Sequence, residues 1–293
     1  MNIIVQIIGG IGKSIAFTAV AKSIKSKYPN SNLFVFTEHP GIFKNHPSIT
    51  KSFKNLKYNS IFYKEYIQDK DVKLFINEPF LQSDLLLGKK HLIETWCDLI
   101  GVPYNDEQPE MFLSEAEEEY YKPYYKTDKP LFVLQTNGGV QGPQELGYNW
   151  VRDLPESIVL EIIDEYKEHY TIVHIKRKDQ LPYQDTFECL DNPRGVAILI
   201  LMSKKRLFMD SFGQHLSAAL NKPSTVCWIG TSHISFGYDI HDNILPNPQE
   251  KEYITDEMIF TPNELYEPIS TFPYSSTDKI FEINKIFQSI NKQ

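Results

Sequence analysis

The sequence has few cysteines, no excess of positive charge and no long apolar run. Its three cysteines, Cys97, Cys189 and Cys227, are odd in number, far apart and outside any CxxC pair, so we expect buried thiols and no metal site built on them. Lysine and arginine total 30 against 38 aspartates and glutamates, which gives a net charge of -8. This balance provides no overall basic surface for a phosphate backbone, so nucleic acid is not the expected partner.

The apolar runs are also too short to cross a bilayer. The run from Val196 to Met202 is among the longest, whereas a transmembrane helix needs roughly 20 such residues. Residues 1–8 have no basic stretch before them of the kind that a secretory signal carries. We therefore expect a cytoplasmic protein with no integral membrane segment.

What the sequence does contain is a regular alternation of strands and helices. Hydrophobic residues make up 41% of the chain, which is enough for two buried cores. Residues 2–8 are almost continuously apolar and end in Gly9-Gly10, a pattern typical of a buried parallel strand. From Lys13 to Lys27 apolar residues recur at helical spacing, and another apolar run follows at residues 32–37. This unit predicts a right-handed parallel crossover.

The second half repeats this alternation after a charged, tyrosine-rich segment at residues 115–129, where we place a domain boundary. The pattern predicts an α/β fold of two doubly wound, Rossmann-like domains. Their expected limits are residues 1–124 and 125–275, followed by a terminal helix at 276–293. The predicted elements of the second half are strands at 131–136, 170–175, 206–210 and 224–230, helices at about 155–168 and from about 212, and an apolar run at 196–202.

The first candidate site is the turn GGIGKS, which contains Gly9, Gly10, Gly12, Lys13 and Ser14. Glycines between a strand and a helix allow a ligand to approach the backbone, and the amides at the helix start favour an anion. A tight turn that only packs the strand on the helix would use the same glycines. The turn also resembles the end of a P-loop, GxxxxGK[ST], but the required first glycine is replaced by isoleucine.

The second candidate site is the loop Thr136, Asn137 and Gly138, which continues to Gly139 and directly follows a predicted strand. The carboxyl ends of such strands are where open α/β sheets bind ligands, although ordinary turns use the same residue types.

The third candidate site is the start of a predicted helix near Phe212. Asp210 or Ser211 can cap this helix, and its first turn then offers backbone amides and the positive end of the helix dipole to a diphosphate. His215 lies in the same first turn. A capped helix with a structural histidine is the alternative interpretation.

These residues carry a family resemblance. The stretch MDSFGQHLSAALNKPSTVCWIG, residues 209–230, continues into residues 231–244 and resembles the donor-binding motif of the family 9 glycosyltransferases, the heptosyltransferases. The stretch GGIGKSIAFTAVAKSIKSKYPNSNLFVF, with HPGIFKNHPSI after it, resembles the N-terminal unit of that family. Residues 78–104 are similar to a segment that some members carry before their domain boundary.

The resemblance implies the GT-B fold, in which two Rossmann-like domains face a central cleft, with the acceptor on the N-terminal side and a nucleotide sugar on the C-terminal side. It also implies that no metal ion is needed. An ADP-sugar is the favoured donor, with UDP- or GDP-sugars as alternatives, and a glycan or lipid-linked saccharide is the expected acceptor. The implied donor-binding residues are Thr136, Asn137, Gly138, Asp210, Ser211, Phe212, Gly213, Gln214 and His215, with Lys176 and its neighbours Arg177 and Lys178 as a possible source of positive charge.

One position departs from the family. In the family this turn usually contains Gly-Asp, and its aspartate is the candidate general base. The residue at that position here is Lys13. With an ordinary pKa of about 10.4 a lysine is a poor base at neutral pH, so we expect Lys13 to hold a phosphate or carboxylate or to screen developing charge. The candidate catalytic residues are therefore Lys13 with Glu38 and His39, and the further carboxylates and imidazoles to test are Glu78, Asp84 and His91.

Three alternatives to a glycan glycosyltransferase remain open on the sequence. One is glycosylation of a modified nucleobase, which would need a basic channel. Another is a P-loop ATPase that uses GGIGKS, with Asp210 as the magnesium-binding aspartate. The third is a relative that binds a sugar nucleotide without catalysis.

Overall fold

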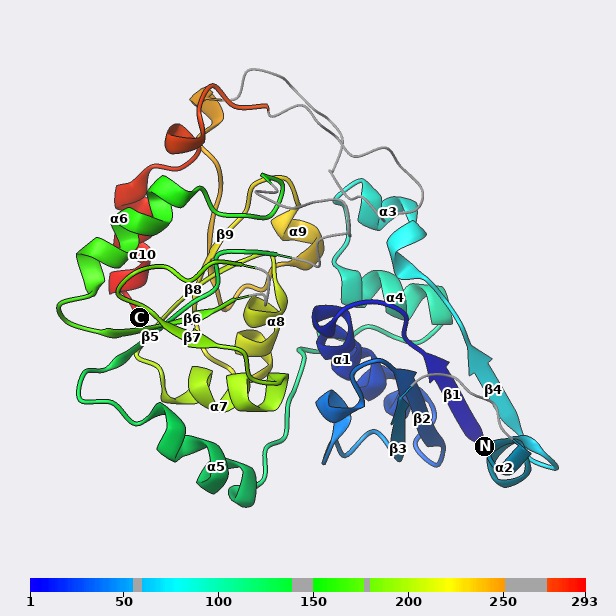
Figure 1. The fold of residues 1–293 in the computed structure, drawn as a ribbon. Coiled ribbons are helices and arrows are strands. Elements are labelled where there is room, and N and C mark those ends of the chain that lie inside the picture. Colours follow the sequence, from blue (N-terminus) through cyan, green and yellow to red (C-terminus); the bar gives the residue numbers. More distant parts are fainter. Residues whose placement is uncertain (55–59, 139–149, 177–179, 251–272) are drawn as a thin grey trace.

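The computed structural model describes residues 1–54, 60–138, 150–176, 180–250 and 273–293 of the chain. It contains a four-stranded sheet and a six-stranded sheet, and every strand pair in both is parallel. The two sheets lie side by side with helices α1 and α8 between them (Figure 1). The predicted α/β fold is confirmed. The predicted limits at residues 124 and 275 stay a prediction.

The smaller sheet has the strand order β3-β2-β1-β4. Because β2 and β4 lie on opposite sides of β1, the direction of winding reverses between β1 and β4. Such a reversal is the topological switch point at which open α/β sheets bind ligands. The strands are β1 (Asn2–Gln6), β2 (Asn32–Thr37), β3 (Lys51–Lys54) and β4 (Val72–Phe75).

The larger sheet has the order β10-β9-β8-β5-β6-β7. Numbered from its own first strand, this is the 3-2-1-4-5-6 order of a complete dinucleotide-binding fold, with the switch point between β5 and β8. Its strands are β5 (Leu131–Leu134), β6 (Thr171–Ile175), β7 (Phe187–Cys189), β8 (Lys205–Met209), β9 (Thr225–Cys227) and β10 (Asp242–Ile244).

Helices connect the strands as the parallel crossovers require. The helices before residue 110 are α1 (Ile11–Lys27), α2 (Ser60–Phe62), α3 (Ser83–Leu86) and α4 (Leu92–Ile100), with short helical turns at Pro40–Phe43, Tyr63–Ile67 and Pro79–Leu81. Those after residue 110 are α5 (Glu115–Tyr121), α6 (Glu156–Tyr166), α7 (Pro193–Met202), α8 (Phe212–Ala219), α9 (His233–Phe236) and α10 (Ile283–Asn291).

The structure assigns secondary structure to two segments that the sequence pattern left unassigned. The apolar run at residues 196–202 belongs to α7, which Asn192 caps by accepting hydrogen bonds from the amides of Arg194 and Gly195. The charged segment after Ser114 starts as the helix α5, because Ser114 and Glu117 form a reciprocal capping box. Local caps thus define where both helices begin, and α5 lies against α7.

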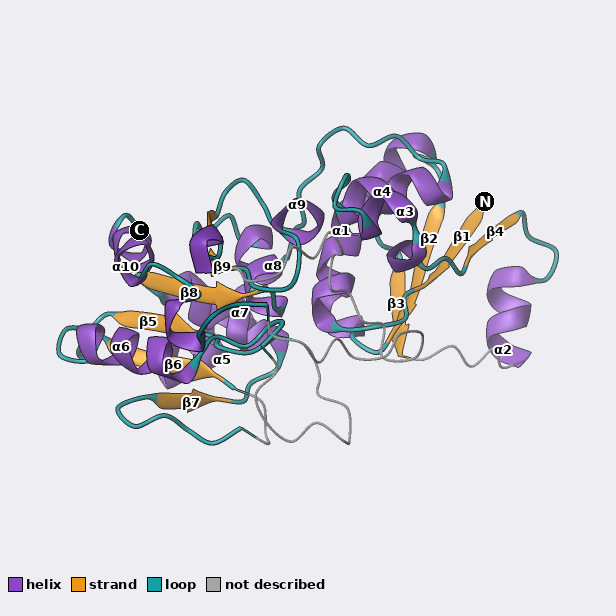
Figure 2. Cartoon of the chain, turned by 90° about the horizontal axis from the view of Figure 1, so that it is seen from above, coloured by secondary structure: helices purple, strands orange, loops and turns teal. Residues whose placement is uncertain are grey.

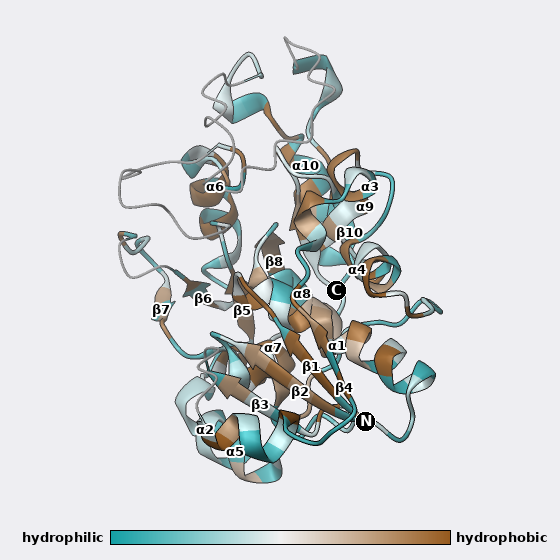
Figure 3. Ribbon diagram, turned by 90° about the vertical axis from the view of Figure 1, so that its right-hand side faces the viewer, coloured by the Kyte–Doolittle hydropathy of each residue, from teal (hydrophilic) through white to brown (hydrophobic). Residues whose placement is uncertain are grey.

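The core is continuous across the two sheets because α1 packs directly on α8 (Figure 2). α1 is buried on nearly all sides, and Phe17 contacts the ring of Trp96 from α4 at a centroid distance of 5.0 Å. The central strands, β1 and β8 among them, are the apolar brown elements of Figure 3. Full burial of one such aliphatic or aromatic side chain stabilises the fold by about 1.5–3 kcal/mol.

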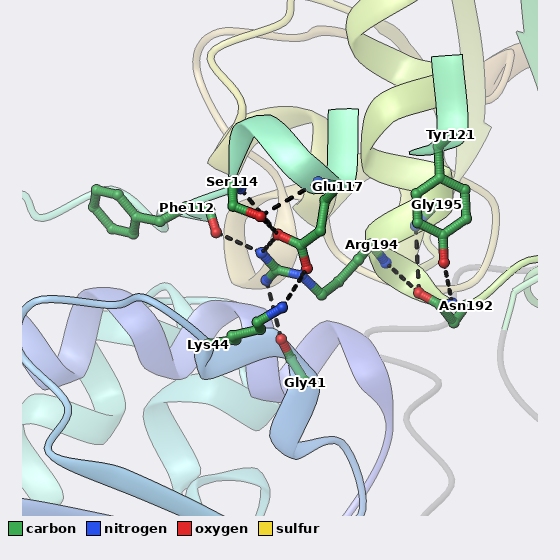
Figure 4. A network of polar contacts seen from close by, with 9 residues as sticks. All are labelled: Gly41, Lys44, Phe112, Ser114, Glu117, Tyr121, Asn192, Arg194 and Gly195. Atoms are coloured by element: carbon green, nitrogen blue, oxygen red, sulfur yellow. Dashed lines mark hydrogen bonds and ion pairs between the residues drawn. The ribbon is translucent and has the colours of Figure 1, made fainter. Parts of the chain in front are cut away.

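A polar network links the α5–α7 pair to the N-terminal part of the chain (Figure 4). Arg194, at the start of α7, pairs with Glu117 of α5 at 2.6 Å and donates to the carbonyl oxygens of Gly41 and Phe112 at 3.1 and 2.6 Å. Lys44 contacts the same carboxylate at 3.0 Å. Arg194 therefore joins three segments that are distant in sequence.

Candidate active site

The three predicted loops lie at the two switch points, and Gly12 of the turn after β1 approaches His215 of α8 at the junction of the two sheets. Thr136–Gly138 follow β5 and Asp210–Gly213 follow β8, so both predicted donor loops stand at the switch point of the larger sheet. The turn Gly9–Gly12 follows β1, and Glu78 comes three residues after β4, at the switch point of the smaller sheet. The topology thus brings four loops together whose sequence positions are far apart.

The start of α8 is capped by a residue that the sequence did not indicate. Ser211 occupies the cap position, but its side chain accepts no hydrogen bond from the helix. Its hydroxyl instead donates to Oε1 of Gln135 at 2.7 Å, and the same oxygen accepts the amide of Gly213 at 3.1 Å. Ser211 thus has the predicted cap position, but Gln135, which reaches across from the end of β5, accepts the helix amide in its place.

The positive charge beside α8 comes from Arg152. Its Nε lies 3.1 Å from the carboxylate of Asp210 and donates to the carbonyl oxygen of Asp210 at 2.9 Å. The Arg152 side chain remains 30% exposed, whereas that of Asp210 is only 7% exposed. The Arg152 side chain is thus fixed in orientation by one partner and is partly exposed, which suits the binding of an anion.

Thr136 lies in a buried hydrogen-bond network. Its hydroxyl contacts Oδ1 of Asn137 at 2.6 Å and Nε2 of His174 at 3.0 Å, and it accepts from Gln180 at 3.2 Å. Burial lowers the pKa of His174 to about 4, with Lys176 contributing, so this imidazole is neutral at pH 7.

The side chain of Lys176 is 5% exposed and already has partners. Its ammonium donates to the carbonyl oxygen of Gln180 at 2.6 Å and lies 3.4 Å from Glu188. Arg177 and Lys178, together with Gly139 of the predicted loop, lie outside the described residues.

His215 joins the donor side to the N-terminal turn. A Cβ built on Gly12 would lie 2.6 Å from Cδ2 of His215, so only glycine allows this close approach of α1 to α8. Nδ1 of His215 is hydrogen-bonded to the hydroxyl of Tyr238 at 2.8 Å. Burial holds the pKa of His215 well below its ordinary value, with His91, Arg152 and His241 adding to the shift. His215 is therefore a neutral group at pH 7.

Lys13 forms an ion pair with Glu78. Its ammonium lies 2.6 Å from both carboxylate oxygens. It also stands over the rings of Phe80 and Trp96, with 4.5 and 5.5 Å between the nitrogen and the ring centroids. Burial lowers the pKa of Lys13, and Glu78 opposes that shift. The partner of Lys13 in this structure is thus a carboxylate of the same chain, and the binding of a ligand by Lys13 stays a prediction.

The remaining candidate bases have different surroundings. Glu38 is exposed, whereas His39 is half-buried and has a pKa lowered mainly by burial. The neighbouring Thr37 hydroxyl contacts Ser14 at 3.0 Å. Their catalytic roles stay a prediction.

His91 and Asp84 lie further along the chain. His91 caps α4 by accepting the amide of Ile93 at 3.2 Å, and burial lowers its pKa to about 4. Asp84 is half-buried in α3.

Neither a metal site nor a membrane-spanning helix is present among the described residues. Within the ranges that the structure describes, no group of three or more histidine, cysteine, aspartate or glutamate side chains is arranged to hold a metal ion. Among the helices of those same ranges, none has both the length and the apolarity needed to cross a bilayer.

Arg152 and Gln135 are site residues that were not predicted from the sequence. A signal for Arg152 did exist, because it is the only basic residue between Lys129 and Lys167, a stretch that contains the second candidate loop. Gln135 carried no comparable signal, since its function depends on the parallel pairing of β5 with β8.

The order of the strands and the paired switch points define a two-domain α/β fold of the type found in GT-B glycosyltransferases. More particularly, it is the fold of the heptosyltransferase-like family 9 enzymes, as three solved structures show. Escherichia coli ADP-heptose LPS heptosyltransferase II is 13% identical, with a TM-score of 0.68 and coverage of 100% of this chain and 98% of that one. A family 9 glycosyltransferase of Veillonella parvula is also 13% identical, with a TM-score of 0.68 and coverage of 99% and 96%.

The third structure is the dodecameric, iron-containing heptosyltransferase TibC in complex with ADP-D-β-D-heptose. It is 13% identical, with a TM-score of 0.64 and coverage of 99% of this chain and 75% of that one. No family profile and no curated protein matches the sequence itself. The predicted fold is confirmed, and the similarity resides in the tertiary structure.

Proposed function

We propose that this chain is a glycosyltransferase that moves a sugar from a nucleotide-sugar donor to a hydroxyl group. An ADP-linked sugar is the first donor to test, because related folds are described with ADP or ADP-heptose. A glycan or lipid-linked saccharide is the proposed acceptor.

The observation that carries this proposal is the arrangement at the β5–β8 switch point. The start of α8 and the guanidinium of Arg152 lie together there, and Asp210 and Gln135 fix their positions. Amides at the start of a helix and a positioned arginine are the groups that stabilise a leaving diphosphate without a metal ion. The neutral histidines His174 and His215 add hydrogen-bonding capacity and no charge.

The contacts of Lys13 do not favour the ATPase alternative. In a P-loop the lysine reaches the β- and γ-phosphates of the nucleotide. Here its ammonium is engaged by both oxygens of Glu78 and lies against two aromatic rings. A phosphate would therefore have to displace a carboxylate from a largely buried lysine.

Replacing Arg152 with methionine is expected to weaken ADP binding by about ten- to a hundredfold, which is the usual value of a hydrogen bond to a charged group. Isothermal titration calorimetry with ADP and ADP-heptose would measure the effect, with UDP- and GDP-sugars titrated in parallel. The control is Lys22→Met, because the Lys22 side chain is 33% exposed and is likewise paired with a carboxylate, that of Glu110.

We expect ADP or one of the nucleotide sugars to bind to the wild-type protein and to Lys22→Met with equal affinity. If Arg152→Met binds as tightly as the wild type, the diphosphate does not lie at the β5–β8 switch point. If none of the nucleotide sugars binds to the wild-type protein, the proposed function is wrong.

A further inference from the structure

We infer that Glu78 is the general base of the proposed transfer reaction and that Lys13 positions it. This inference rests on the proposed function. It concerns the position where the related family is expected to have an aspartate and this chain has Lys13. The carboxylate that the turn lacks is supplied by the loop after β4.

Topology brings Glu78 to that place. The strands β1 and β4 are adjacent and parallel, with Val5 opposite Phe75, so the segments that follow them leave the same edge of the sheet. Lys13 comes from the segment after β1 and Glu78 from the segment after β4. The two residues are 65 positions apart and meet at 2.6 Å. Glu78 therefore stands at the switch point of the N-terminal sheet.

Two separate sets of contacts hold this carboxylate near the start of α8. On one side, Gly12, next to Lys13, lies against the ring of His215. On the other side, Phe80 packs on Phe236 of α9 at a centroid distance of 6.0 Å, and the carbonyl oxygen of Phe236 accepts the side-chain amide of Gln214 at 2.9 Å. Both connections end in the first turn of α8, beside the proposed diphosphate site.

The carboxylate is fixed and still has room for a substrate. Lys13 contacts both of its oxygens, and the amide of Phe80 donates to Oε1 at 3.2 Å. A carboxylate offers about four acceptor positions, so these three contacts leave one for an acceptor hydroxyl. The Glu78 side chain is 35% exposed, whereas that of Lys13 is 3% exposed. The lysine is thus the buried support and the glutamate the accessible group.

The chemistry balances without a further reactant. The acceptor oxygen forms a bond to the anomeric carbon of the donor while its proton moves to Glu78. The bond between that carbon and the diphosphate oxygen breaks, and the diphosphate leaves with the electron pair. Lys13 keeps the carboxylate in position for this proton transfer, because its ammonium contacts both carboxylate oxygens.

Glu78→Gln tests the role of the base because it keeps the shape and most hydrogen bonds and removes the proton acceptor. The assay is the release of ADP from ADP-heptose, with water and a panel of saccharides as nucleophiles. We expect the turnover to fall at least about a hundredfold while the dissociation constant of ADP stays unchanged. The matched control is Glu110→Gln, since the Glu110 side chain is 36% exposed and also pairs with a lysine.

The role of Lys13 is tested by a double-mutant cycle. Lys13→Met alone should lower the turnover, but in the Glu78→Gln background it should cause no further loss, because Lys13 acts only through Glu78. A Glu78→Gln protein that releases ADP at the wild-type rate would overturn the inference. Failure of the wild-type protein to bind any sugar nucleotide in calorimetry would instead refute the proposed function, and the inference with it.

Discussion

Replacing Arg194 with methionine is expected to lower the free energy of unfolding by about 3–5 kcal/mol, the usual cost of removing one partner from a buried ion pair. The side chains of Arg194 and Glu117 are only 9% and 15% exposed. The substitution also removes the donors to the carbonyl oxygens of Gly41 and Phe112. Urea denaturation followed by circular dichroism at pH 7 would measure the change.

The control for this variant is Lys44→Met, which removes a second cation from the same carboxylate. The side chain of Lys44 is 56% exposed, and exposed pairs contribute no more than about 1 kcal/mol. We therefore expect a small effect of Lys44→Met and a large effect of Arg194→Met. Equal losses of unfolding free energy in the two variants would show that burial does not determine how much the Arg194–Glu117 pair stabilises the fold.

The same ion pair gives a prediction for pH. Arg194, followed by contacts from Ser114 and Lys44, holds the pKa of Glu117 far below its usual range. A carboxyl group whose pKa is lowered by folding stabilises the folded state fully at pH values above its unfolded pKa of about 4.3. This contribution to the free energy of unfolding is lost as the pH falls towards the folded pKa. The stability difference between the wild type and Arg194→Met should therefore shrink between about pH 5 and pH 3.

Replacing Gly138 with alanine is expected to weaken ADP binding at least about tenfold and to destabilise the fold by about 1–3 kcal/mol. A Cβ at this position would clash with the carbonyl oxygen of Asp210 and would lie 2.8 Å from Nε of Arg152. The carbonyl is backbone and cannot move without shifting the start of α8. Because the same atoms orient Arg152, the added methyl group disturbs the proposed diphosphate site directly.

The comparison for Gly138→Ala is Gly41→Ala. A Cβ on Gly41 meets no atom within 4 Å, and the backbone carbonyl that accepts from Arg194 is retained. This variant should keep the wild-type stability to within about 0.5 kcal/mol and the wild-type affinity for ADP. Calorimetry and urea denaturation on both variants would test the prediction. Unchanged ADP affinity in Gly138→Ala would place the diphosphate away from the loop after β5.

Much of the donor side was predictable from local sequence. Thr136–Gly138 and Asp210–Gly213 follow apolar strands directly, and a strand followed by a glycine-containing loop is itself a local signal. The sequence did not indicate which side chain caps α8. Ser211 has the expected residue type, but Gln135 forms the hydrogen bond, because the end of β5 lies beside that of β8.

The acceptor side was less predictable for the same physical reason. A lysine in the first turn had an obvious alternative interpretation as a phosphate ligand, and Glu78 was one carboxylate among several. Their pairing depends on β4 adding to the sheet next to β1, a contact that no local pattern specifies. Glu38 has an equally favourable sequence position after β2, yet its carboxylate is exposed.

The sequence by itself determined the alternation of strands and helices, the glycine turns and thus the α/β class, because apolar periodicity and turn residues act over a few neighbouring positions. The tertiary structure decided the partners of the charged groups: Lys13 with Glu78, Arg152 with Asp210, and Arg194 with Glu117. These pairs join residues that are 58 to 77 positions apart. Only the order of the parallel strands and the packing of the helices bring such distant charges into contact.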